Sequence, residues 1–176
     1  MLNGKLTGLR AIEKADLESL RQWRNRPEYR RFFRETKEIS SEQQDRWYEK
    51  VVLSDPNTIM FAIDSLDTKE LIGACGLCYI DRLNLNADLS IYIGTEGRYI
   101  DDQYAPDAAR TLLRYAFEEQ NLHRIWCEIY DFDEAKKTLF EKLGFSLDGR
   151  HRETHWTEGR WVDSLFFSLL SHEFAA

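Results

Sequence analysis

Cysteines are few in this 176-residue sequence, and long apolar segments are absent. The three cysteines cannot all pair and are too few for a disulfide scaffold, which favours a reducing compartment. The longest unbroken apolar run covers residues 59–63, whereas a membrane-spanning helix needs about 20 residues. The first residues lack the apolar core of a secretory signal. We therefore expect a cytoplasmic protein that does not associate with a membrane.

Residues that interrupt regular structure are also scarce, with 9 glycines and 3 prolines and no repeat. Apolar residues make up 43% of the chain and aromatic residues 13%, which is enough for one packed core and excludes global disorder. The length fits a single domain over residues 1–176. Acidic residues outnumber basic residues by 31 to 24, and this net charge of −7 argues against a DNA-binding protein.

Apolar periodicity divides the chain into short strands and amphipathic helices. Strands are predicted over residues 5–12, 58–65, 71–80, 86–93, 123–130, 145–156 and 161–170. Helices are predicted after Asp16, from Pro27, from Ser41 to about residue 53, from Pro106, and over 133–143. Ser41 with Gln44 matches a capping box, and Pro106 suits the first helical position. This order of elements predicts an α/β (α+β) fold, a mixed sheet with helices on its faces.

Two residue groups have the spacing of a metal or redox site. Cys75 and Cys78 form a CxxC, but a strand would direct the two thiols to opposite faces, which favours core cysteines. His151, Glu153 and His155 share one face of a predicted strand, but no fourth ligand is evident and a polar outer face is favoured. We predict no metal site.

Basic and acidic side chains mark two further places. Six arginines lie within residues 21–34 among aromatic residues, a pattern typical of a solvated helix face, of nucleic-acid binding or of a mobile cap over a pocket. Asp88 lies alone in a predicted strand, where it either faces solvent or is placed for proton chemistry. The pattern alone favours solvent.

Several segments resemble the GCN5-related N-acetyltransferase (GNAT) superfamily, in particular its branch of ribosomal-protein N-terminal and spermidine acetyltransferases. The matching segments are residues 23–25 (WRN), 111–117 (TLLRYAF), 121–125 (NLHRI), 140–145 (FEKLGF) and the tail 149–163. The resemblance covers nearly the whole chain. It implies a mostly antiparallel sheet of about seven strands with a splay between two parallel strands, residues 86–93 and 123–130.

The resemblance implies acetyl-CoA as co-substrate, bound in that splay. The pantetheine arm is expected to bond to backbone groups of Ile91, Tyr92 and Ile93. The diphosphate is expected at the turn that precedes the next helix, where free N–H groups and the helix dipole favour an anion.

That turn departs from the family pattern Arg/Gln-x-x-Gly-x-Gly/Ala, of which only Ala105 remains. Gln103 replaces a glycine whose small size lets the backbone approach phosphate. Asp101 and Asp102 add negative charge where a polyanion binds, and Arg98 is near enough in sequence to compensate. The expected cofactor-binding residues of this segment are Arg98, Ile100, Asp101, Asp102, Gln103, Tyr104 and Ala105.

The proton chemistry that the resemblance implies also departs from the family. Asp88 matches an acidic position of the spermidine enzymes and is the expected base for the acceptor amine. The family tyrosine that protonates the leaving thiolate is replaced by Phe140, which has no proton to give, and an asparagine seven residues earlier is Asp133. Tyr104 and Tyr130 are considered as substitute acids.

The sequence therefore predicts an acetyl-CoA-dependent N-acetyltransferase that acts on a primary amine of a polyamine, a protein N-terminus or an amino sugar. The departures at the cofactor site leave a second hypothesis open, a catalytically degenerate GNAT-fold module with a binding or regulatory role. A homodimer is compatible with either hypothesis. Nucleic-acid binding by the arginine-rich segment is a third and more distant hypothesis.

Overall fold

The structure, a computed structural model, describes residues 1–175. Its strands are β1 (Leu2–Asn3), β2 (Thr7–Ala11), β3 (Ile59–Ser65), β4 (Leu71–Asp81), β5 (Asn86–Ile93), β6 (Arg124–Tyr130), β7 (Ser146–Thr157) and β8 (Arg160–Leu170). Its helices are α1 (Leu17–Asn25), α2 (Pro27–Arg30), α3 (Ser41–Trp47), α4 (Tyr104–Arg114) and α5 (Glu134–Lys142). Both α3 and α4 continue into a π-helical turn, Tyr48–Val52 and Tyr115–Glu119. None of these helices is long and apolar enough to cross a bilayer.

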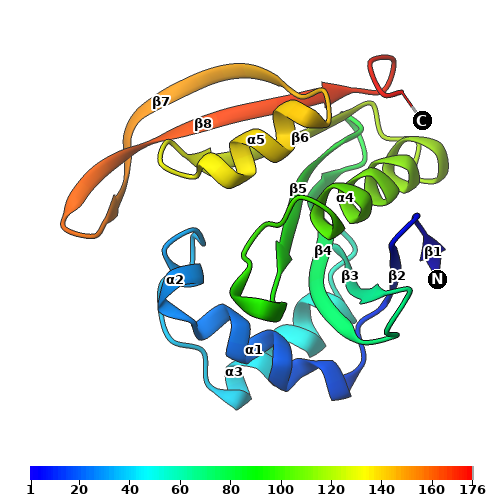
Figure 1. Ribbon diagram of the computed structural model, residues 1–176. Coiled ribbons are helices and arrows are strands. Elements are labelled where there is room, and N and C mark those ends of the chain that lie inside the picture. Colours follow the sequence, from blue (N-terminus) through cyan, green and yellow to red (C-terminus); the bar gives the residue numbers. More distant parts are fainter. Residues whose placement is uncertain (176) are drawn as a thin grey trace.

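The strands form one sheet in the order β1-β2-β3-β4-β5-β6-β8-β7. β5 and β6 are parallel, and every other neighbouring pair is antiparallel. The parallel pairing joins residues 86–88 to residues 124–126 and then ends, so the two strands separate beyond Asp88 (Figure 1). The predicted fold class and the splay are confirmed. The sheet has eight strands rather than about seven because the two-residue β1 also pairs with β2.

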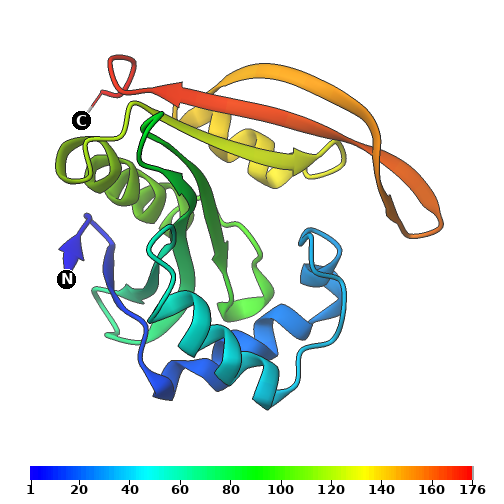
Figure 2. The same cartoon turned by 180° about the vertical axis from the view of Figure 1, so that it is seen from behind.

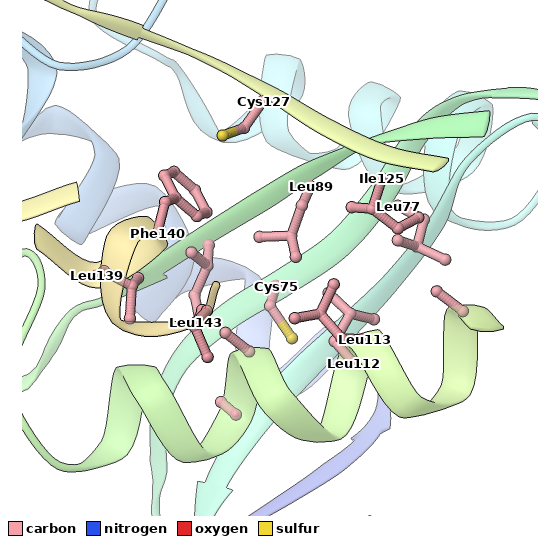
Figure 3. Packing of buried hydrophobic residues seen from close by; sticks show 14 of the residues in the cluster. Cys75, Leu77, Leu89, Leu112, Leu113, Ile125, Cys127, Leu139, Phe140 and Leu143 are labelled. Carbon is pink, nitrogen blue, oxygen red and sulfur yellow. The ribbon is translucent and has the colours of Figure 1, made fainter. Parts of the chain in front are cut away.

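Helices cover both faces of the sheet (Figures 1 and 2). On one face α4 and α5 pack against strand side chains such as Cys75 and Leu89, as Figure 3 shows. On the other face the segment from α1 to α3 buries Trp23 and Tyr29 against Tyr92. Successive strand residues point to opposite faces, so the sheet contributes to two separate hydrophobic clusters.

The predicted capping box of α3 is wrong by one residue, and the predicted start of α4 is wrong by two. The capping box of α3 uses Ser40 and Gln43, because Gln44 is buried and its side chain does not reach back to the helix start. α4 begins at Tyr104, so Pro106 is its third residue rather than its first. The earlier start follows from Asp101, whose carboxylate accepts hydrogen bonds from the first N–H groups of the helix.

The end of β5 fixes the segment that leads from α1 to α2. Gly94 follows β5, and a Cβ there would lie 1.9 Å from the Trp23 ring, so glycine is required for this contact. The Gly94 carbonyl accepts hydrogen bonds from Arg26 at 2.9 Å and from the Tyr29 hydroxyl at 3.4 Å. These contacts hold α2, and with it the chain that follows, beside the splay.

Candidate active site

The splay leaves one edge of β5 without a partner strand. The N–H of Gly94 donates to Ile72 of β4, and the preceding N–H, that of Ile93, donates to the Tyr99 carbonyl at 2.9 Å on the opposite side. Because N–H directions alternate along a strand, the backbone of Ile91 also faces the splay. Of the three residues expected to bind the pantetheine arm, Ile91 directs its backbone to the splay. The Ile93 N–H is already bonded to Tyr99. The Tyr92 ring packs against Phe33, on the face of the sheet that the segment from α1 to α3 covers.

Asp88 lies where β5 and β6 begin to separate, and it is buried, with 6% of its surface exposed. The expectation from pattern alone that it faces solvent is wrong, because the segment after α2 covers this end of the strand. Its carboxylate lies 3.1 Å from the guanidinium of Arg34, which also lies 3.1 Å from Glu128 of β6. Burial raises the pKa of Asp88 to about 6, even though Arg34 opposes the rise.

The carboxylates of Asp88 and Glu128 both line a cavity of about 390 Å³. One wall is formed by the segment around Phe32 and Phe33, for which a cap over a pocket was one of three alternatives that the arginine-rich sequence left open. Seven charged side chains also line the cavity, beside apolar ones such as Trp47 and Met60. The charged side chains are Arg24, Arg34, Glu35, Asp55, Asp88, Glu128 and Lys136. The cavity thus joins a strand edge to a set of opposed charges.

The N-terminus of α4 is already bonded to a carboxylate of the chain itself. Asp101 accepts hydrogen bonds from the N–H groups of Gln103, Tyr104 and Ala105 at 3.3, 3.0 and 2.7 Å. Asp101 is buried, whereas Asp102 points outward and pairs with Lys142 at 3.3 Å. These N–H groups are the donors that an anion at a helix N-terminus would use.

Arg98 and Ile100 flank the same turn. Arg98 is exposed and forms an ion pair with Glu96 at 3.3 Å. Ile100 packs against both hydrophobic clusters and lines a cavity of about 230 Å³ between the start of α4 and α5. A diphosphate therefore fits this place only after Asp101 has left the helix N-terminus.

The start of α5 carries a second buried carboxylate. Asp133 caps the helix by accepting from the Lys136 N–H at 3.1 Å, and the Tyr99 hydroxyl donates to it at 3.4 Å. Burial raises the pKa of Asp133. Phe140, about two turns further along, is fully buried against Phe145, with ring centroids 5.0 Å apart.

Neither tyrosine considered as an acid lines the cavity that holds Asp88. Tyr104 is the first residue of α4 and packs against the hydrophobic cluster between the sheet and helices α4 and α5. Tyr130 ends β6, and its ring stacks on His155 at a centroid distance of 4.4 Å. Burial raises the pKa of Tyr130 to about 12.

Two residues of the cavity, Glu128 and Lys136, escaped sequence reasoning. The parallel register places Asp88 opposite Trp126, and Glu128 lies two residues further on the same face of β6. Lys136 lies four residues before Phe140, on the same side of α5. The positions of Glu128 and Lys136 relative to Asp88 can be derived only when the register of β5 with β6 and the packing of α5 are known.

The residues with metal-site spacing do not come together. A bulge in β7 pairs His151 with Ser164 but His155 with Val162, which breaks the alternation expected between the two histidines. Within residues 1–175 no group of three or more His, Cys, Asp or Glu side chains is arranged to hold a metal ion. Cys75, Cys78 and Cys127 are free cysteines.

Comparison with known proteins identifies the family of this chain. The family profile described as an acetyltransferase (GNAT) domain matches residues 7–146. The N-acetyltransferase p20 of Bacillus licheniformis is 31% identical over 115 residues, which are 65% of this chain and 64% of that protein. The spermidine N(1)-acetyltransferase of Escherichia coli K12 is 25% identical over 169 residues, 96% of this chain and 88% of that protein. The match thus spans less than two thirds of p20. It spans 55% of another relative, the putative ribosomal N-acetyltransferase YdaF of Bacillus subtilis.

The solved structures that resemble this chain include spermidine N-acetyltransferase from Vibrio cholerae in complex with CoA and spermine. It superimposes with a TM-score of 0.87 at 25% identity, over 96% of this chain and 97% of that chain. With a family profile that covers most of the sequence and a fold shared over nearly its whole length, the chain belongs to the GNAT acetyltransferase family.

Proposed function

We propose that the protein is an acetyl-CoA-dependent N-acetyltransferase whose acceptor is a cationic primary amine. One observation carries this proposal: the carboxylates of Asp88 and Glu128 hold a guanidinium, that of Arg34, at the fork of β5 and β6. A place that binds one nitrogen cation between two carboxylates is suited to bind another. The free edge of β5 brings an extended acyl donor to the same fork.

In this proposal Asp88 takes the proton from the acceptor amine. A base must be ionised to accept a proton, and the raised pKa of Asp88, about 6, keeps it ionised at neutral pH while making it more basic than an ordinary aspartate. Acetyl-CoA supplies the activated acyl group. The backbone of Ile91 and the start of α4 are the places proposed to hold it, the latter after Asp101 has moved.

A small polyamine is the acceptor class that we propose. Glu35 and Asp55 line the same cavity as Asp88 and Glu128, so several carboxylates face one space. A chain of amines can place one nitrogen at the fork and another near the outer carboxylates. The spermidine acetyltransferases among the relatives support this class over an amino sugar or a protein N-terminus.

One observation favours a second function, a non-catalytic module of the same family. Asp101 already satisfies the N–H groups at the start of α4, which an incoming diphosphate would have to free. If that carboxylate does not yield, the fold keeps its cation-binding fork but does not bind the donor.

Thiol release from acetyl-CoA, measured against spermidine, spermine, a short peptide and glucosamine, tests the proposal. We expect release with the polyamines, and weaker release with the peptide and the sugar. Calorimetry with CoA alone separates the two functions. Absence of CoA binding, together with no thiol release from any amine, favours the module, and release with glucosamine alone overturns the polyamine assignment.

A further inference from the structure

The proposed reaction needs a proton donor for the departing sulfur, and position 140 does not provide one. Phe140 has no ionisable group and is fully buried. Tyr104 and Tyr130 do not line the cavity. The donor must therefore be sought among the side chains that do face the fork.

Lys136 is the ammonium group that the fold brings to this place. It is the third residue of α5, four residues before Phe140, so the two side chains leave the helix one turn apart on the same side. Its side chain lines the cavity together with Asp88 and Glu128, and its Nζ lies 5.2 Å from the centroid of the Tyr99 ring.

The Lys136 ammonium differs from its neighbours on α5 in having no ion-pair partner among the described residues. Lys137 pairs with Glu134 at 3.9 Å and Lys142 with Asp102 at 3.3 Å. The donors of Lys136 are thus available to a group that enters the cavity. Its backbone N–H carries the helix cap, so the side chain can be changed without removing the cap.

The surroundings of Lys136 make its proton easier to release. Burial lowers its pKa, and the charge of Arg34 from the segment after α2 acts in the same direction. Three groups oppose the shift, Asp133 at the start of α5, Cys127 of β6 and Asp88 of β5. The net result is a pKa below the usual lysine value, which makes this ammonium a stronger acid than an exposed lysine.

We propose that Lys136 is a catalytic residue that protonates the departing sulfur, a role that rests on the proposed function. As the acceptor nitrogen bonds to the acetyl carbon and the carbon–sulfur bond breaks, Asp88 takes the proton that the nitrogen loses. The Lys136 ammonium gives a proton to the sulfur. Transfer of the proton from Asp88 to the neutral amine of Lys136 restores both groups.

The first arm of the test compares Lys136→Met, Lys136→Arg and the control Lys137→Met. Lys136→Met should lower kcat by about 10²-fold, the lower end of the range for a general acid, because a thiolate leaves readily. The wild type should lose activity at alkaline pH as Lys136 deprotonates. Lys136→Arg keeps the charge but not the acid, because a guanidinium does not release its proton, so kcat should fall and the alkaline limb should be absent. Lys137→Met should match the wild type.

The second arm observes the proton directly, by NMR titration of protein with ¹³C- and ¹⁵N-labelled lysine. One lysine signal should titrate below the others, should vanish in Lys136→Arg, and should share its midpoint with the alkaline limb. The role of Lys136 is overturned if its NMR signal titrates like those of the other lysines, or if Lys136→Met turns over as fast as an active wild type. The proposed function would still stand in either case. No thiol release by the wild type with any amine overturns the proposed function, and the role of Lys136 with it.

Discussion

The carboxylate of Asp88 and the guanidinium of Arg34 are 3.1 Å apart at the point where the sheet splits. Arg34 belongs to the segment after α2, so a residue from one end of the chain occupies the centre of the fork. The side chain of Asp88 is nearly buried, whereas that of Arg34 is 44% exposed. The carboxylate is therefore fixed, and the cation above it is the group that can be exchanged.

Replacing Arg34 by Met should strengthen amine binding and move the pH profile. Without the competing guanidinium, the KM of a polyamine should fall about fivefold, the equivalent of about 1 kcal/mol for a partly exposed ion pair. Arg34 also favours the ionised form of Asp88, so its removal should shift the acidic limb of kcat/KM upward from about pH 6. Steady-state kinetics across pH measure both effects.

Arg30→Met is the matched control for this change. Arg30 lies on α2 and pairs with Glu38 at 3.8 Å, away from the fork. Its removal should leave both KM and the acidic limb in place. An unchanged KM in Arg34→Met would show that the amine does not bind where Arg34 now lies.

Asp88→Asn should abolish the acidic limb of activity. An ionised Asp88 is the active form, so wild-type activity should rise as pH increases through about 6, the pKa of this group. Removing a general base lowers the rate by about 10²–10⁴-fold. Asp88→Asn should show this loss in kcat, and the remaining activity should not change between acidic and neutral pH. A loss of less than about twofold would contradict the assignment of Asp88 as base.

The same variant has a signature in stability. The pKa of Asp88 is about 6 in the folded chain and about 4 in an unfolded one, so ionisation of Asp88 favours unfolding. Its contribution to stability is fully present below about pH 4 and is lost as pH rises through about 6. Thermal unfolding across this window should show a decline in the wild type that Asp88→Asn lacks.

Most of the fold could be predicted from the sequence because its elements are defined by local signals. The strand over residues 86–93 was predicted with its observed bounds. The turn between β7 and β8 consists of Glu158 and Gly159. Both residues have positive φ, the geometry that a two-residue hairpin loop requires. The helix starts were less accurate because the sequence offers competing local signals: Ser40 with Gln43 forms the capping box in place of Ser41 with Gln44, and Asp101 starts α4 ahead of Pro106.

The candidate site could be predicted only in part, because it is assembled from residues far apart in the chain. Asp88 was singled out as a candidate base through the resemblance, but its burial depends on the segment that carries Arg34, 54 residues earlier. Glu128 and Lys136 join it only through the pairing of β6 and the packing of α5. The resemblance supplied the parallel pair of residues 86–93 and 123–130, but neither its exact register nor the packing of α5 follows from local sequence, so these two side chains were not predicted to line the cavity.

Arg10 should be a determinant of stability outside the site. Its guanidinium lies 2.7 Å from Asp16 and 2.7 Å from Asp64, and both carboxylates are nearly buried. Burial alone would raise the pKa of Asp16, but hydrogen bonds from Arg10 and from the Glu13 N–H outweigh it, and the net pKa is lowered. Arg10→Met should lower the free energy of unfolding by about 3 kcal/mol, the order expected when one partner of a buried ion pair is removed.

Acid titration checks the same interaction. Because the folded-state pKa of Asp16 lies below its unfolded value, its stabilising effect is present at neutral pH and is lost as pH falls through the folded value. Arg10→Met should therefore lose less stability on acidification than the wild type does. Arg21→Met, which breaks an exposed pair with Glu18, should change the free energy of unfolding by less than about 1 kcal/mol.

Asp101 competes with any anion for the N-terminus of α4, because it already binds the N–H groups there. Asp101→Ala frees the N–H groups that it now binds, so CoA affinity should rise while the free energy of unfolding falls by about 1 kcal/mol, as for a lost helix cap. Asp102→Asn, altered at an exposed carboxylate, should change affinity less and leave stability nearly unchanged. Calorimetry and thermal unfolding measure both quantities. If neither the wild type nor Asp101→Ala binds CoA, the start of α4 is not a diphosphate site and the non-catalytic module becomes the better account of this chain.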